Sequence, residues 1–397
     1  MSFNFRGTHR DLNMKYIHQN KNWTKFKWDV HLIAPRLGEA RNRQGRLMGR
    51  MESLGFPLRD EARLKTLTMD IVKTSEIEGD LLDARKVRSS IARRLALKVG
   101  GLVPSDRHVD GIVDMILDAT TNFNKPLSKN RLLAWHSCLF PSGYSGMKKI
   151  KTGKWRDDKT GPMTVVSGSM GKERVHFEAP AAERLPSEIN FFLKWFNENQ
   201  DIDPVIKSGI AHLWFVTLHP FDDGNGRIAR AIADMLLARS DNSRDRFYSM
   251  SVQIRKDRDS YYKILEKTQK TAGNRLSGTD ITAWLEWFLL CLIRALKTTE
   301  ITLSDVFKKA KFWETHPEKA FNERQRLMIN RLFDGFEGKL TSSKWAKLAK
   351  CSQDTALRDI LDLIKKGVLV KDPGGGRSTS YSFKNPSSPR ELGYSEE

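Results

Sequence analysis

The sequence predicts a mainly α-helical fold with a single β-hairpin in its central part. Three observations lead to this prediction. Apolar residues recur every three or four positions through most of the 397 residues. One stretch, "MTVVSGSMGKERVHFEAP", instead joins two β-prone runs through a Ser/Gly turn. Hydrophobic residues make up 39% of the chain, enough for the cores of two or three domains.

Residues 1–105 are predicted to form a helical N-terminal domain. In "LRDEARLKTLTMDIVKTSEIEG", Leu64, Leu67 and Ile71 recur with helical period, and Gly79 supplies a stop signal. Half of the formal net charge of +20 lies in this domain. The excess is compatible with solvated helix faces and with an acidic partner, and both interpretations stay open at this point.

Residues 106–300 are predicted to form a core in which two helices meet at an unusual turn. The turn is "HPFDDGNGRIAR", residues 219–230, between the apolar periodic runs "IKSGIAHLWFVTL" and "IARAIADMLLAR". Arg227 and Arg230 fall in the first turn of the second helix, where the helix already carries partial positive charge and free N–H groups. We therefore expect an anion at this position.

The composition of the turn points to a polyphosphate and a metal ion. Gly224 and Gly226 allow the backbone amides to converge on phosphate. Arginines three positions apart on one helix face can grip several phosphate oxygens. One carboxylate, Asp222 or Asp223, with phosphate and water would suffice for Mg²⁺. His219 is the candidate general base. The alternative is an ordinary turn between two core helices.

The twelve residues also resemble a known motif. "HPFDDGNGRIAR" is similar to the Fic family motif HPFx[DE]GNGRxxR and agrees with it at every specified position. The resemblance implies a helical Fic core that transfers AMP from ATP to a Ser, Thr or Tyr hydroxyl of a protein. It implies that His219 is the base, that Asp223 binds Mg²⁺, and that Gly224, Asn225 and Gly226 form an anion hole. It also implies that Arg227 holds the α- and β-phosphates and Arg230 the γ-phosphate. Asp222 occupies the free position of the motif and receives no role.

The predicted hairpin, residues 163–177, resembles the flap of the Fic family. The resemblance implies that a protein target binds along it in extended form, by main-chain pairing at the edge of the hairpin. Such pairing does not reveal the target's sequence. An ordinary surface hairpin is the alternative. Tyr261 and Tyr262 fall in a later helix that also resembles the family's core, and we expect them to pack between helices.

A second resemblance concerns regulation. "TSEIEG", residues 74–79, is similar to the inhibitory motif [ST]xxxE[GN] of one Fic class. Glu78 would stand at a helix C-terminus, where negative charge is unfavourable. Pairing Glu78 with Arg230 would neutralise both charges and occupy the γ-phosphate position. The alternatives are a solvated helix-end residue and a Fic enzyme that removes AMP, with Glu78 orienting water.

Residues 301–384 resemble a winged helix-turn-helix domain. The sequence from "LTSSKWAKLAK" onward predicts a helix, a turn, a second helix capped by Ser352, and two strands around "DPGGGRST". The predicted apolar face of the second helix consists of Leu357, Ile360, Leu361 and Ile364. The tail, residues 385–397, is predicted to be disordered.

The function of this C-terminal domain is left open between DNA and protein contact. DNA binding would direct Gln353, Thr355 and Arg358 toward bases and Arg377 of the wing toward phosphate. Three carboxylates on the same helix oppose a polyanion: Asp354, Asp359 and Asp362. A DNA-binding regulator whose Fic core senses nucleotide without turnover is therefore the alternative to a protein adenylyltransferase.

The remaining features bear on compartment and assembly. The three cysteines, Cys138, Cys291 and Cys351, lie far apart without paired spacing, which argues against disulfides or structural zinc and favours a reducing cytoplasm. We find no signal peptide and no stretch apolar enough to span a membrane. The sequence leaves a homodimer open.

Overall fold

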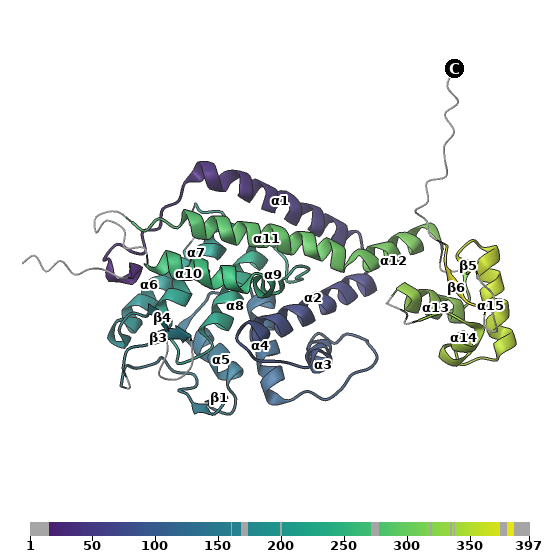
Figure 1. Ribbon diagram of the computed structural model, residues 1–397, viewed down its shortest axis with the longest axis horizontal. Coiled ribbons are helices and arrows are strands. Elements are labelled where there is room, and N and C mark those ends of the chain that lie inside the picture. Colours follow the sequence, from purple (N-terminus) through teal and green to yellow (C-terminus); the bar gives the residue numbers. More distant parts are fainter. Residues whose placement is uncertain are drawn as a thin grey trace, which may run out of the picture. The chain divides into compact units, whose positions relative to one another are not determined.

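The structure is a computed structural model in which helices dominate. It describes residues 16–159, 161–167, 174–198, 201–270, 278–317, 320–333, 336, 338–373 and 379–384. The chain divides into two compact units, Met1–Ile301 and Thr302–Glu397, which are described separately (Figure 1). The prediction of a mainly α-helical chain is confirmed. The predicted boundary after residue 105 lies within the first unit.

The first unit begins with a short 3₁₀ helix, Ile17–Gln19, and three α-helices. These are α1 (Val30–Glu52), α2 (Phe56–Ile77) and α3 (Ala84–Arg94). Asp29 caps α1 by accepting a hydrogen bond from the backbone N–H of His31 at 2.8 Å. Helix α2 ends where the sequence predicts, because Gly79 adopts a left-handed conformation with φ of 87°.

Among the described residues, the first unit contains eight further α-helices and a second 3₁₀ helix, Ala182–Arg184. The α-helices are α4 (Arg107–Thr121), α5 (Lys129–Leu139), α6 (Leu185–Asn197), α7 (Pro204–Leu218), α8 (Asn225–Asp241), α9 (Met250–Lys256), α10 (Arg258–Lys270) and α11 (Thr282–Thr302). Helices α7 and α8 pack along each other, and α8 also contacts α2, α4, α5 and α9 (Figure 1). The buried side chains of α7 and α8 form the centre of the core, so the turn between them is held on both sides.

Strands are few, and each sheet has two antiparallel strands. The predicted hairpin is confirmed as β3 (Thr164–Ser167) and β4 (Arg174–Glu178), which pair with a register shift between Val165 and Val166. A second, very short hairpin was not predicted: β1 (Tyr144–Ser145) with β2 (Lys148–Lys149). Two-residue strands carry too little periodicity to be recognised in a sequence.

The second unit contains four helices and two strands among its described residues. They are α12 (Ser304–Thr315), α13 (Glu323–Phe333), α14 (Ser342–Leu348), α15 (Gln353–Lys365), β5 (Leu369–Lys371) and β6 (Tyr381–Phe383). Strands β5 and β6 pair, and Leu340 adds a single bridge to Tyr381. Ser352 caps α15, as predicted, by accepting from the N–H of Thr355 at 3.2 Å.

The predicted apolar face of α15 is partly wrong. Ile360 is fully buried, but the exposed fractions of Leu357 and Leu361 are 39% and 52%. The buried face instead runs through Ala356, Ile360 and Leu363. It also includes Asp359, a charged residue that hydrophobicity alone assigns to the outside.

Two of the three carboxylates expected to oppose DNA are paired within the second unit. Asp359 accepts hydrogen bonds from Arg324 at 2.7 Å and from Asn322 at 2.9 Å. Asp362 accepts from Gln325 at 2.7 Å. These contacts connect α15 to α13 and to Asn322, the residue before α13, so both carboxylates have hydrogen-bond partners within the unit. Arg377 and the tail, residues 385–397, lie outside the described residues.

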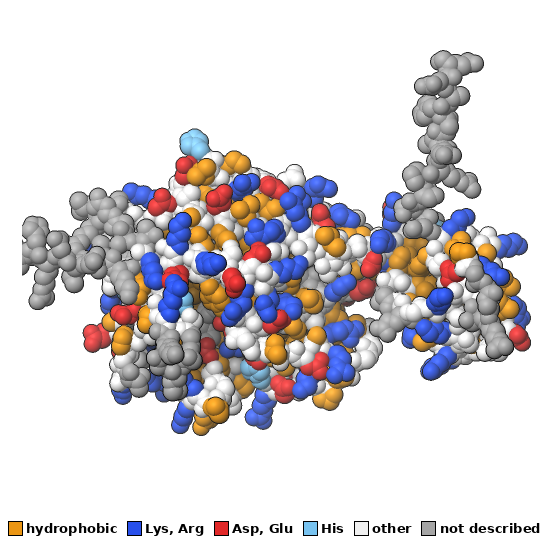
Figure 2. Space-filling view, in the orientation of Figure 1, with side chains coloured by type: hydrophobic (Ala, Val, Ile, Leu, Met, Phe, Trp, Pro, Cys, Tyr) orange, Lys and Arg blue, Asp and Glu red, His pale blue; other side chains and the backbone are white. Residues whose placement is uncertain are grey.

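The surface and the cysteines add two observations. On the face drawn in Figure 2, basic side chains are spread over the first unit with acidic ones between them. Cys138, Cys291 and Cys351 are all free thiols. Within the described part of the chain, no helix combines the length and the apolar character needed to cross a membrane.

Candidate active site

The turn between α7 and α8 is closed by its own asparagine. The side chain of Asn225 accepts a hydrogen bond from the N–H of Phe221 at 3.0 Å and donates one to the Phe221 carbonyl at 2.8 Å. Gly224, the residue before α8, has φ of 80°. A Cβ atom at Gly224 would lie only 2.9 Å from the Phe140 ring, so glycine is required by both conformation and space.

His219 ends α7 in a strained conformation. Its φ and ψ are 47° and 55°, in the left-handed region that a residue with a Cβ adopts rarely. Its Nδ1 lies 3.2 Å from the carbonyl oxygen of Val216, which favours the tautomer with the proton on Nδ1. Burial lowers the pKa of His219 to about 4. The ring is therefore neutral near pH 7, and Nε2 is the atom able to accept a proton.

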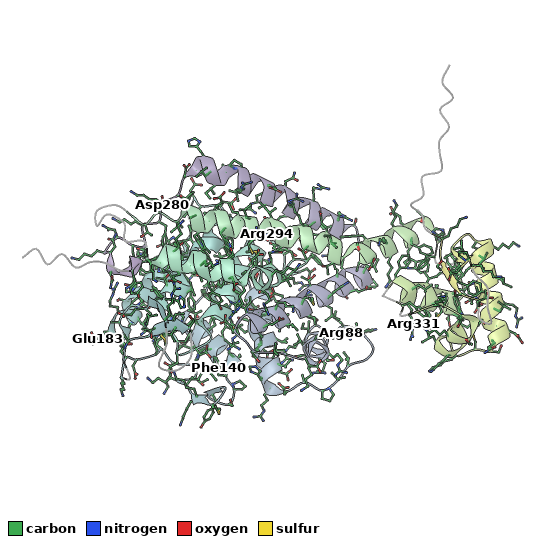
Figure 3. All side chains as sticks on the ribbon, viewed as in Figure 1. Arg88, Phe140, Glu183, Asp280, Arg294 and Arg331 are labelled. Atoms are coloured by element: carbon green, nitrogen blue, oxygen red, sulfur yellow. The ribbon has the colours of Figure 1, made fainter. Side chains whose placement is uncertain are left out.

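Arg227 lies in the first turn of α8, as predicted, whereas Arg230 lies in the second turn because α8 begins at Asn225. The exposed fractions of their side chains are 5% and 2%. Arg227 stacks over Phe140, the residue labelled in Figure 3, with its guanidinium 5.0 Å from the ring centre. Among the described residues, Nε of Arg227 and Nη1 of Arg230 are buried without a hydrogen-bond partner. Buried unpaired donors are costly, which favours an anionic ligand here.

Glu78 reaches the same place from the end of α2. Its Oε1 accepts a hydrogen bond from Nη2 of Arg230 at 2.7 Å. Thr74, one turn earlier, holds Arg230 through its side chain at 2.7 Å and its carbonyl at 2.9 Å. A Cβ atom at Gly226 would come within 2.2 Å of Oε1 of Glu78, so the carboxylate lies directly against the beginning of α8. The predicted pairing of Glu78 with Arg230 is present in this structure.

Glu78 and the turn before α8 border a cavity of about 750 Å³. Its lining includes His219, Asp223 and Gly226 from the turn, Glu78 from α2, and residues of the β3–β4 hairpin and of α10. The hairpin therefore lies at the cavity that contains the candidate base, as the flap interpretation expects.

Comparison with known proteins identifies part of the chain. Residues 126–237 match the Fic/DOC family, and residues 16–97 match a domain of unknown function, DUF4172. Residues 126–237 are therefore similar to a Fic domain. A crystal structure of a Fic family protein from Desulfovibrio desulfuricans G20 shares the fold, with a TM-score of 0.54 at 20% identity over 90% of this chain and 97% of that chain.

Curated relatives match in sequence over shorter stretches. A probable protein adenylyltransferase of Aquifex aeolicus is 27% identical over 118 residues, 28% of this chain and 35% of its own length. A protein adenylyltransferase of Caenorhabditis briggsae is 26% identical over 180 residues, 44% of this chain and 32% of its own. A protein adenylyltransferase of Aedes aegypti is 34% identical over 197 residues, which are 48% of this chain and 34% of its own length. The chain thus spans about a third of the length of each of these relatives.

The two aspartates of the Fic domain motif have different partners. Asp222 accepts a hydrogen bond from the backbone N–H of Lys151 at 2.9 Å and so holds the segment after β2. Asp223 accepts one from the hydroxyl of Ser145 in β1. Both line the cavity. The unpredicted β1–β2 hairpin therefore supports the side chain that is the candidate Mg²⁺ ligand.

Two residues that contact the turn between α7 and α8 escaped the sequence analysis. Arg156, buried with its side chain 1% exposed, donates from Nε to the carbonyl of His219 at 2.8 Å and also binds the carbonyl of Pro180. His136 stacks on Phe221 with ring centres 4.1 Å apart. Burial lowers the pKa of His136 to about 4. Both residues hold the turn between α7 and α8 from separate segments, and no local sequence pattern marks such long-range support.

Asp80 forms a second acidic contact near the two arginines of α8. Its Oδ2 lies 3.4 Å from Nη1 of Arg227 and 2.7 Å from Nε2 of His108. The hydrogen bond with His108, together with the charge of Arg227, holds the pKa of Asp80 below its usual range. The same hydrogen bond raises the pKa of His108. The segment that carries Glu78 therefore places one carboxylate on each arginine.

The two tyrosines of α10 differ in burial. Tyr261 is 1% exposed and its hydroxyl lies 2.8 Å from Nε2 of His212. Tyr262 is partly exposed, and the guanidinium of Arg258 lies 5.0 Å from the centre of its ring. Both line the cavity. Tyr261 thus packs between helices as expected, and its hydroxyl is already paired.

Proposed function

We propose that this protein is an adenylyltransferase that moves AMP from ATP to a Ser, Thr or Tyr hydroxyl of a protein. One observation carries the proposal: two buried arginine nitrogens have no hydrogen-bond partner among the described residues, and Gly226, which lies next to Nη1 of Arg230, lines the same cavity as the neutral His219. Cationic side chains and a helix N-terminus favour a polyphosphate. The match to the Fic/DOC family and the names of the relatives agree with this chemistry.

In the proposed reaction, Nε2 of His219 takes the proton from the target hydroxyl. The hydroxyl oxygen forms a bond to the α-phosphorus of ATP, and the bond from that phosphorus to the bridging oxygen of pyrophosphate breaks. Arg227 holds the α- and β-phosphates and Arg230 the γ-phosphate. The backbone at Gly224, Asn225 and Gly226 stabilises the charge that develops on the phosphoryl oxygens. AMP remains on the target and pyrophosphate leaves.

Asp223 is the proposed protein ligand of Mg²⁺. Its carboxylate lines the cavity close to the proposed phosphate site. Within the described residues there is no group of three or more His, Cys, Asp or Glu side chains arranged for a metal. Mg²⁺ keeps much of its water and uses phosphate oxygens as ligands, so a single carboxylate fits it. When bound, the ion neutralises phosphate charge and assists departure of pyrophosphate.

Glu78 is the proposed inhibitor of this activity. Its carboxylate accepts a hydrogen bond from Nη2 of Arg230 and lies against Gly226. A γ-phosphate bound by Arg230 would need the space that this carboxylate occupies. ATP bound beside Glu78 would be displaced from the alignment that in-line attack requires.

Incubation of the purified protein with ATP labelled at the α-phosphate, with and without Mg²⁺, tests the proposal. We expect Mg²⁺-dependent label on the Glu78→Gly variant and much less on the parent. ATP labelled at the γ-phosphate is the matched control and should leave no label. A folded Glu78→Gly variant that labels neither itself nor any protein of a cell lysate would contradict the proposal.

Removal of AMP is a second candidate activity, favoured by the presence of Glu78 in the cavity with His219. Glu78→Gly protein that has labelled itself serves as its substrate. If added unlabelled parent protein removes the label and parent with Glu78→Gly does not, removal is the parent's reaction. Retention of label in both mixtures favours transfer alone.

For residues 301–384 we propose a winged helix-turn-helix domain that contacts protein rather than DNA. The order α13, the Leu340 bridge, α14, α15, β5 and β6 supports this topology. Leu357 and Leu361 are exposed on α15, where a DNA-reading helix carries polar and basic side chains. Fluorescence anisotropy with duplex DNA at two salt concentrations tests the choice. Tight binding that weakens steeply with salt would favour DNA.

A further inference from the structure

The β3–β4 hairpin is attached to other segments of the first unit at two separate places. Near its base, Phe177 packs against Tyr16 with ring centres 5.2 Å apart, and the carbonyl of Glu178 lies 2.7 Å from Nε2 of His18. The other end of the hairpin, toward Ser167 and Arg174, has no such aromatic packing in the described residues. A two-stranded hairpin is only marginally stable by itself, so this end needs another support.

Glu266 of α10 supplies that support. Its Oε1 accepts a hydrogen bond from Nη2 of Arg174 at 2.9 Å, and its Oε2 lies 2.7 Å from Nδ1 of His176. The other ring nitrogen of His176 lies 2.6 Å from the hydroxyl of Ser167 on β3. One carboxylate is therefore connected to both strands of the hairpin.

Glu266 is well placed to act as a fixed negative charge. The exposed fraction of its side chain is 18%, compared with 69% for Arg174 and 25% for His176. Hydrogen bonds from Lys270, and then from His176 and Arg174, lower the pKa of Glu266 to about 2. The carboxylate stays ionised at every pH at which the protein would work.

The same carboxylate lines the cavity. Glu266, Arg174 and His176 all border the space that also contains His219. The interaction thus joins the two walls of the site, the hairpin and α10, on the side away from the anchored base of the hairpin. The exposed valines of the hairpin, Val166 and Val175, lie opposite each other in its pairing register.

We propose that Glu266 is a positioning residue, which holds the outer half of the hairpin at the height where a bound target strand presents its hydroxyl to His219. This inference rests on the proposed function for its catalytic part, because it assumes transfer to a target aligned by the hairpin. Its structural part, control of the outer half of β4 by Glu266, is independent of the reaction.

Glu266→Gln is the main test because it removes the charge and keeps the size of the side chain. Lys270→Gln is the matched control: Lys270 pairs with Glu266 within α10 and has no contact with the hairpin among those described. Hydrogen–deuterium exchange of the β4 amides is measured first, on the full chain without nucleotide. We expect exchange up to about fivefold faster in Glu266→Gln, the effect of losing a partly exposed ion pair, and no change in Lys270→Gln.

Activity is then measured in the Glu78→Gly background. We expect Glu266→Gln to lower the rate of AMP transfer at saturating ATP several-fold while the Kd for ATP changes less than twofold, because the phosphate site on α8 is untouched. Arg174→Gln added to Glu266→Gln should cause little further loss, since the two act through one contact.

The outcomes separate the inference from the proposed function. Unchanged β4 exchange in Glu266→Gln, or equal changes in Glu266→Gln and Lys270→Gln, would overturn the positioning role. So would a loss of ATP affinity equal to the loss of rate. If Glu78→Gly itself transfers no AMP, the proposed function fails, and the exchange measurement still decides whether Glu266 holds the hairpin. Should Glu266→Gln fail to fold, Arg174→Gln on the exposed hairpin gives the same readouts.

Discussion

Replacement of Glu78 by glycine is the most direct perturbation of the site. Arg230 donates hydrogen bonds to Thr74, at 2.7 and 2.9 Å, and to Glu78, at 2.7 Å. The Glu78→Gly change removes only the charged contact, so Thr74 keeps the guanidinium in place. The substitution should be tolerated because Glu78 follows the last residue of α2 and precedes Gly79.

The size of the effect follows from the strength of that contact. A hydrogen bond to a charged group contributes about 1.5 to 3 kcal/mol, and each 1.4 kcal/mol is about a factor of ten. The Glu78 side chain is 28% exposed, which places its contribution toward the lower end of this range. We therefore expect AMP transfer to rise by at least about tenfold, with about 150-fold as the upper bound.

The assay compares initial rates of labelling from ATP labelled at the α-phosphate. Glu76→Gln is the matched control, because Glu76 lies one half-turn earlier on α2 and pairs with Lys73 and Arg255 rather than Arg230. The double variant Glu78→Gly, Arg230→Ala should lose the gain. If Glu78→Gly is folded and no faster than the parent, or if Glu76→Gln is equally activated, the pairing of Glu78 with Arg230 does not restrain the enzyme.

Three further predictions address the same site. His219→Ala should lower the rate of AMP transfer by a factor of about 10² to 10⁴ and leave the affinity for ATP nearly unchanged. Because burial lowers the pKa of His219 to about 4, its base form is lost only as the pH falls toward 4. The parent's rate between pH 5 and 8 should therefore show no step near 6.5. An equal loss of ATP binding, or a step near 6.5, contradicts this role. Asp223→Ala should weaken Mg²⁺-dependent ATP binding, measured by calorimetry, more than Asp222→Ala, whose carboxylate holds the Lys151 backbone; equal effects reject the assignment. Asp80→Asn in the Glu78→Gly background should tighten ATP binding by up to about fivefold, because a partly exposed carboxylate 3.4 Å from Arg227 is neutralised; weaker binding would mean that Asp80 orients Arg227 instead.

The sequence predicted those parts of the fold and site that depend on local pattern. The end of α2, the cap at Ser352 and the turn before α8 each follow from a few adjacent residues with defined conformational preferences. The hairpin was recognisable because its two β-prone runs differ from their helical surroundings. The pairing of Glu78 with Arg230 could be anticipated because each charge lies at the unfavourable end of its own helix.

The parts that escaped prediction depend on contacts between distant segments. Arg156 reads as one basic residue among many, and its role arises only because it meets the His219 carbonyl. On α15, Asp359 looks like a surface residue until its bonds to Arg324 are seen. Leu361 looks like a core residue, yet it is 52% exposed because the neighbouring helix packs on a different face. Hydrophobicity ranks residues by type, whereas burial depends on which partner satisfies each group.

We propose that the segment from Thr74 to Asp80 regulates the site as a unit. Thr74 holds Arg230 without competing for its charge, while Glu78 and Asp80 each place a carboxylate on a different arginine. Because both carboxylates belong to one short stretch at the end of α2, a displacement of that stretch would release both arginines together. Single substitutions release one arginine each. If the segment stays in place, the effects of Glu78→Gly and Asp80→Asn on the rate of AMP transfer at low ATP concentration should therefore multiply. A double variant with the same rate as Glu78→Gly would mean that loss of Glu78 already lets the segment move away from α8.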